Sequence, residues 1–133
     1  MILRRCLGQT GAFSDWKLFG ESVTSRLTRI EFFRALDRIR LEGRTPEASL
    51  DAGMDVFDEF YQRTNIVPMS ELILDRASQP LVFPLKTLDS IHLATALVWK
   101  DDNLDDLTLV THDGPLARAA KAMGLAVLGV EKS

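Results

Sequence analysis

The stretch LTLVTHDGPLARAAKAMGLAVL, residues 107–128, decides the fold of this chain. Its apolar start predicts a β-strand over 107–111, and the turn residues that follow lead into a helix that Gly124 ends. A further apolar strand is expected over 125–130. Because the connection between these two strands contains a helix, they are expected to run parallel in one sheet.

The remaining chain repeats this alternation of helices and short apolar strands. Pro68 limits the strand that contains it to a sheet edge or a strand end. The pattern favours an α/β fold, a three-layer α/β/α sandwich with a mainly parallel sheet, in which ligands bind beyond the carboxyl ends of the strands. The other strands are expected over 22–27 and 65–69, and the longer helices over 28–43, 46–63 and 87–100.

The composition is that of an ordinary soluble domain. The 133 residues are 46% hydrophobic and 26% charged, which suits one compact domain. No apolar run approaches the roughly 18 residues of a membrane span, and the first residues do not form a secretory signal. The lone Cys6 fits a reducing cytoplasm. We therefore expect a cytoplasmic protein with no membrane partner.

The net charge of −3 is unevenly distributed along the chain. Residues 1–44 carry nine Lys or Arg against five Asp or Glu, whereas the rest of the chain is acidic. This basic segment fits either a polyanion or a solvated helix face with ion pairs, and composition favours the second. Arg34 illustrates the choice, since it is placed to pair with Glu31 or Asp37 and equally to contact a phosphate.

Acidic residues stand at element junctions in this pattern. Glu31 is expected in the first turn of the helix 28–43, Asp89 in the first turn of the helix 87–100, and Asp113 directly after a strand. Each has a structural explanation, because carboxylates favour helix N-termini and Asp forms turns. Taken singly, that explanation is the better one for each residue.

Taken together, these acids indicate a metal site. Strand ends and helix starts meet at one rim of such a sheet, so Glu31, Asp89 and Asp113 are expected to converge there. Gathered carboxylates repel each other unless a cation lies among them. Oxygen ligands with room for water suit Mg²⁺ or Mn²⁺, ions that promote cleavage of phosphate esters.

Longer segments of the sequence resemble a known family. The blocks SRLTRIEFFRAL, LKTLDSIHLATAL and LVTHDGPLARAAKAMGLAVL are similar, in order and spacing, to the downstream blocks of PIN-domain ribonucleases. They are most similar to the VapC-type toxins of bacterial toxin–antitoxin pairs. The second block is the most specific, and the resemblance extends from about residue 22 to the end of the chain.

The resemblance implies a fold, an activity and partners. The fold is PIN-like, Glu31, Asp89 and Asp113 match metal-site acids of the family, and Thr111 matches a hydroxyl neighbour of that site. The implied activity is Mg²⁺- or Mn²⁺-dependent endonucleolytic cleavage of RNA that leaves a 5′-phosphate. The implied partners are a cognate antitoxin, which would occupy an apolar groove of the helical hairpin 29–63, and a second copy in a homodimer.

The front of the chain departs from the family pattern. Family members open with an apolar strand that ends in an Asp, and MILRRCLGQ at residues 1–9 matches the helix after that strand. We therefore expect one PIN-like domain over 1–133 that is truncated at its N-terminus, so that strands 22–27 and 107–111 lack their common neighbour. A start codon upstream of Met1 is our hypothesis. A chain that begins at Met1 is expected to bind metal weakly and to have little nuclease activity.

Other functions remain open at this point. One is a catalytically impaired PIN-like binding module that only engages an antitoxin, and an upstream strand with its Asp distinguishes this from the nuclease. Another is Mg²⁺-dependent phosphoryl transfer to protein. The position of Asp89 inside a helix argues against the latter, because phosphoacceptor acids normally end strands.

Overall fold

The computed structural model describes residues 22–103 and 107–129. The chain divides into two compact units, 1–66 and 67–133, and each is presented by itself. The predicted single domain over 1–133 stays a prediction. Two sequence-based expectations, the helix at residues 1–9 and the environment of Cys6, lie outside the described residues.

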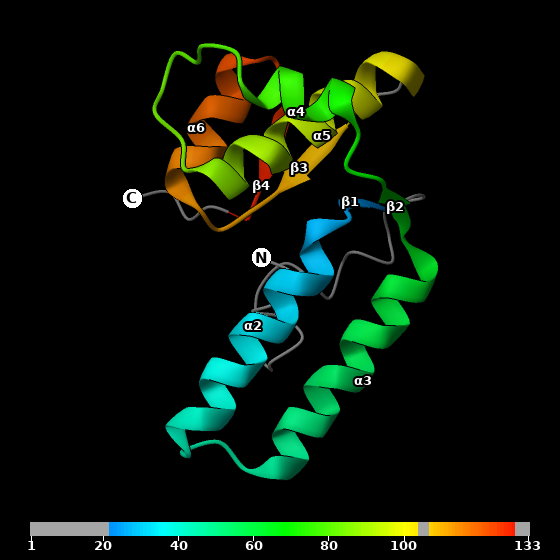
Figure 1. Ribbon diagram of the computed structural model, residues 1–133, viewed down its shortest axis with the longest axis vertical. Coiled ribbons are helices and arrows are strands. Elements are labelled where there is room, and N and C mark those ends of the chain that lie inside the picture. Colours follow the sequence, from blue (N-terminus) through cyan, green and yellow to red (C-terminus); the bar gives the residue numbers. More distant parts are fainter. Residues whose placement is uncertain (1–21, 104–106, 130–133) are drawn as a thin grey trace. The chain divides into compact units, whose positions relative to one another are not determined.

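The first unit is a helical hairpin with a small sheet (Figure 1). Strand β1 (Val23–Ser25) is followed by α2 (Leu27–Glu42), α3 (Glu47–Arg63) and β2 (Asn65–Val67). β1 pairs with β2. The turn between the helices depends on Gly43, which caps α2 in the left-handed conformation with φ 73°. The strands are shorter than predicted, and α2 begins one residue earlier.

Aromatic side chains fill the space between α2 and α3. The rings of Phe32 and Phe57 stack with centroids 4.0 Å apart and planes within 4°, and both side chains are fully buried. Leu36, Leu50 and Phe60 complete this core. The helical spacing of the sequence predicts Ile30, Phe33, Leu36 and Ile39 on one side of this helix. The prediction is wrong for Ile30, which is 59% exposed, whereas Leu36 is buried and Phe33 and Ile39 pack against the core.

The second unit contains a strand–helix–strand crossover with two further helices (Figure 1). Its elements are α4 (Glu71–Ala77), α5 (Thr87–Asn103), β3 (Thr108–Val110), α6 (Gly114–Ala122) and β4 (Ala126–Leu128). β3 and β4 are parallel, as predicted, with Leu109 opposite Val127 in the register. Helix α4 begins at a Ser70 cap, whose Oγ accepts a hydrogen bond from the Ile73 N–H at 3.3 Å.

Small and aliphatic side chains form the core of the second unit. Alanines of α5 and α6 let the helices approach each other closely, and leucines fill the remaining volume. Ala120 is fully buried in the last turn of α6. The buried members of this cluster are Leu93, Ala96, Leu97, Leu116, Ala119, Ala120 and Leu125.

These elements confirm the predicted α/β class with parallel strands. Within the part of the chain that is described, the strands form two separate pairs, β1 with β2 and β3 with β4. No helix in residues 22–103 or 107–129 combines the length and apolar character needed to span a membrane.

Candidate metal centre

Asp113 lies at the elbow between β3 and α6, where it caps the helix. Its Oδ2 accepts a hydrogen bond from the Leu116 N–H at 2.9 Å. Its own N–H donates to the Thr111 Oγ1 at 3.0 Å. The structural explanation of this polar elbow is therefore correct, because Asp113 satisfies an N–H group at the start of α6 that has no partner within the helix.

Capping does not exclude metal binding by the same carboxylate. An ionised Asp has about four lone-pair positions on its two oxygens, and the cap uses one of them. Asp113 is also only half-buried. The cap fixes the carboxylate at a defined place beyond the carboxyl end of β3, which is the location expected for a ligand in this fold class.

Thr111 fixes the backbone that carries Asp113. The threonine is 4% exposed, and its N–H donates to the Leu128 carbonyl of β4 at 2.9 Å. Its hydroxyl accepts the Asp113 N–H. Thr111 therefore ties the elbow both to the neighbouring strand and to the acid, so its contribution to a site is to position Asp113.

Asp89 lies in the first turn of α5, as predicted, and is half-buried. The start of this helix is held by two bonds of Ser90, whose N–H donates to the Lys86 carbonyl at 2.9 Å and whose Oγ donates to the Thr87 carbonyl at 2.7 Å. Helices α5 and α6 share the core of the second unit. Asp89 and Asp113 thus stand at the starts of two helices that pack against each other.

Glu31 lies on α2 in the first unit and is half-buried. The sequence placed it in the first turn of its helix, but α2 begins at Leu27 and has no acidic residue in its first turn. The early start follows from Ser25, whose Oγ accepts the Leu27 N–H at 3.1 Å directly after β1. The helix dipole stabilises carboxylates chiefly in the first turn, and Glu31 lies beyond it. The dipole therefore explains an acid at this position less well than the sequence analysis assumed.

The predicted set of acids is divided between the units. Asp89, Thr111 and Asp113 lie in the second unit and Glu31 in the first. Among residues 22–103 and 107–129, no group of three or more His, Cys, Asp or Glu is arranged to hold a metal ion. The convergence of Glu31 with the other acids therefore stays a prediction. The donors themselves are carboxylate oxygens, which fit Mg²⁺ or Mn²⁺.

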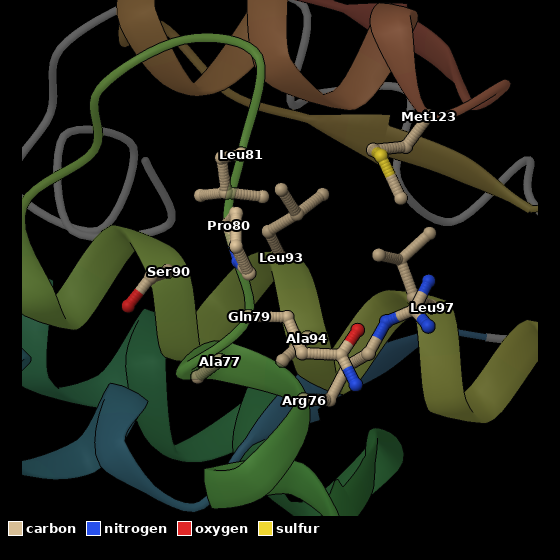
Figure 2. A pocket seen from close by; sticks show the side chains of 10 residues that line it. All are labelled: Arg76, Ala77, Gln79, Pro80, Leu81, Ser90, Leu93, Ala94, Leu97 and Met123. Carbon is tan, nitrogen blue, oxygen red and sulfur yellow. The ribbon is translucent and has the colours of Figure 1, made fainter.

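A small hollow in the second unit was not predicted from the sequence (Figure 2). Its volume is about 280 Å³, including space open to solvent. Leu93, Leu97 and Met123 line one side, with Met123 pointing toward Leu97, and Arg76 and Gln79 are at the edge (Figure 2). None of the predicted site residues lines it.

The described residues form an α/β protein with a parallel strand pair, and Asp89, Thr111 and Asp113 lie in its second unit. Comparison with known proteins identifies the family. The chain is 36% identical over 110 residues to Ribonuclease VapC46 of Mycobacterium tuberculosis (strain ATCC 25618 / H37Rv). The aligned segment covers 80% of this chain and 72% of that relative. It is 32% identical over 124 residues to Ribonuclease VapC35 of Mycobacterium tuberculosis (strain CDC 1551 / Oshkosh), covering 90% of this chain and 83% of that protein.

The chain belongs to the VapC family of PIN-domain ribonucleases. No family model matches it, and no solved structure matches it. The similarity to the two VapC ribonucleases extends over most of the chain and confirms the family that the sequence blocks indicated.

Proposed function

We propose that this chain is a metal-dependent endoribonuclease toxin of a toxin–antitoxin pair, acting on RNA in the cytoplasm and neutralised by a cognate antitoxin. The observation that carries the proposal is the similarity to ribonucleases over 80% to 90% of the chain. The polar elbow at Asp113 and the acid at the start of α5 support it, because each supplies a carboxylate at the start of one of two helices that share a core.

Glu31, Asp89 and Asp113 are the proposed ligands of one Mg²⁺ or Mn²⁺ ion. When bound, such an ion lowers the pKa of a coordinated water and stabilises charge on phosphoryl oxygens. The three carboxylates would hold the ion and orient its waters for attack on the phosphodiester. Their own mutual repulsion is relieved by the same ion.

Thr111 is a positioning residue in this proposal. Its hydroxyl accepts the Asp113 N–H, and its N–H is bound to β4, so the elbow has little freedom. Removing the hydroxyl leaves a buried N–H with one partner fewer and lets the Asp113 carboxylate move. The effect on catalysis then comes through Asp113 rather than through contact with RNA.

The proposed partners are RNA, an antitoxin and a second copy of the chain. Aromatic side chains of α2 and α3 fill the core between these two helices. An antitoxin segment would therefore meet outer residues of the hairpin on α3, where Val56 is the large exposed apolar residue among those described. The groove within the hairpin 29–63 stays a prediction.

The test is cleavage of a defined single-stranded RNA with Mn²⁺, using the chain and any upstream residues that its reading frame encodes. The parent should produce RNA fragments that carry a 5′-phosphate. Asp89→Asn removes the charge of a proposed ligand with little change in shape, so we expect its cleavage rate to be at least about a hundredfold lower. Asp51→Asn, an exposed acid of α3, is the matched control and should leave activity unchanged. Equal cleavage by the parent and by Asp89→Asn contradicts the proposal.

A further inference from the structure

The outer face of α2 carries an exposed stripe of mixed character. Ile30, Arg34, Asp37 and Leu41 follow each other at spacings of four, three and four residues, so they lie along one side of the helix. Ile30 is 59% exposed and Leu41 75% exposed, whereas the opposite side of α2 is filled by its core contacts with α3. We call these four residues the α2 seam.

We propose that the α2 seam binds the same seam of a second copy of this chain, with the two helices antiparallel about a two-fold axis that passes between Ala35 and Leu36. This deepens the self-association part of the proposed function by assigning it a surface, and it does not depend on the nuclease chemistry. The partner is a second copy of the chain because, in an antiparallel pair, each residue of the seam faces a residue of matching character on the other copy.

The order of residues along the seam is self-complementary. In an antiparallel pair centred between Ala35 and Leu36, Ile30 lies opposite the partner's Leu41, and Arg34 lies opposite the partner's Asp37. The alternating spacing of four and three residues is that of the contact positions of a two-stranded coiled coil. Because a two-fold axis repeats each contact, the interface contains two apolar layers at its ends and two ion-pair layers in its middle.

The charges of the seam favour a second copy over RNA. Arg34 and Asp37 form an ion pair within α2 at 2.8 Å, and their side chains are 71% and 38% exposed. The seam is therefore neutral overall, and a polyanion gains little from it. An exposed pair of this kind contributes little to the stability of its own helix, so its members can take partners across an interface at small cost.

The composition of the seam also predicts how tightly it binds. Charged residues at central contact positions fix the register and direction of paired helices but reduce the stability of the pair. The dimer is thus expected to be weak, specific for the antiparallel direction, and weaker at high ionic strength.

Sedimentation velocity of the full chain over a concentration range of about a hundredfold tests the proposal. The parent should convert from monomer to dimer within that range. Arg34→Asp and Asp37→Arg each place like charges opposite each other, and each should raise the dimer dissociation constant at least about a hundredfold. The double variant with both substitutions restores complementary pairs and should dimerise like the parent.

Mixing the two single variants gives a sharper outcome. Arg34→Asp and Asp37→Arg should each be monomeric alone but should form a heterodimer with each other, because only that pairing places opposite charges in both central layers. If Arg34 and Asp37 interact only within their own helix, the mixture of the two variants should form no heterodimer. Asp51→Arg, on an exposed position of α3, is the control with the same charge change as Asp37→Arg and should leave dimerisation unchanged.

Several results would overturn the proposal. A monomeric parent at all concentrations, a dimer that both single variants retain, or no heterodimer in the mixture each contradicts it. If the seam binds RNA instead, Asp37→Arg should tighten and Arg34→Asp should weaken binding of a single-stranded RNA, with no change of mass. Asp89→Asn separates this proposal from the enzymatic one, because it should dimerise like the parent whether or not it cleaves RNA.

Discussion

The two units of the molecule are built from different kinds of core. In the first, α2 and α3 are held together by stacked aromatic rings, with Phe32 against Phe57. In the second, α5 and α6 meet through alanines and leucines. A few large side chains fill the core of the first unit. The core of the second unit depends on small side chains where α5 and α6 approach each other. The two cores should therefore fail in opposite ways when they are altered.

The largest effect is expected from truncating the aromatic stack. Phe57 is fully buried and contacts Phe32, Phe33, Phe60 and Tyr61, so Phe57→Ala should lower the free energy of unfolding by about 3–5 kcal/mol. Val56→Ala, at the exposed neighbour, should cost far less. Urea unfolding followed by circular dichroism measures both. Similar losses for the two variants would mean that the rings do not carry this core.

Enlarging a side chain in the second core should have the next largest effect. Ala120 is fully buried, and Ala120→Leu should cost about 1–3 kcal/mol, because the added carbons have no space between α6 and its neighbours. Ala122 is exposed on the same helix, and Ala122→Leu is the control. An Ala120→Leu protein as stable as the parent in urea would contradict the close approach of the helices.

The cap of α6 separates stability from chemistry in the second unit. Asp113→Ala should cost about 1 kcal/mol, whereas Asp113→Asn keeps a capping oxygen and should be nearly neutral for stability. Ser70→Ala removes the equivalent cap of α4 and should destabilise without reducing RNA cleavage. Thermal unfolding and cleavage assays on these variants give the comparison. If Asp113→Asn cleaves RNA as fast as the parent, Asp113 acts only as a cap.

The smallest effect is expected on the outside of the first unit. Asp37→Asn removes two exposed ion pairs, with Arg34 at 2.8 Å and Arg40 at 3.3 Å. Its cost in a monomer should stay within about 0.5 kcal/mol, because solvent screens both pairs. Urea unfolding at low protein concentration measures this value. A loss above about 1 kcal/mol would show that Asp37 stabilises the fold itself.

Local patterns predicted most of the elements correctly. The end of the helix predicted over 28–43 and the parallel crossover from β3 to β4 depend on residues that are close in sequence, and the structure confirms both. The position of Ile30 was mistaken because a helical period alone does not reveal which of two overlapping apolar faces meets the neighbouring helix. That choice is made by the stacking of Phe32 on Phe57, a contact between distant segments.

The candidate site was predictable only in part, for the same reason. The acid at the start of α5 and the elbow at Asp113 follow from local signals, and both lie where they were expected. Helix α2 begins one residue earlier than predicted, next to the hydrogen bond between the Leu27 N–H and the Ser25 Oγ, so Glu31 lies beyond the first turn. Hydrophobic periodicity does not reveal such a side-chain hydrogen bond. A meeting of Glu31 with Asp89 and Asp113 stays a prediction, and the sequence blocks indicate it only through the resemblance to the family.

Binding of Mn²⁺, measured by electron paramagnetic resonance of the free ion, tests the central claim most directly. The parent, which is the chain with any upstream residues that its reading frame encodes, should bind one ion per chain. Glu31→Gln, Asp89→Asn and Asp113→Asn should each weaken binding at least about tenfold, since each removes one charged ligand from a shared ion. Asp51→Asn should bind like the parent. Undiminished binding by Glu31→Gln, with the other two variants impaired, would contradict a ligand set that includes Glu31.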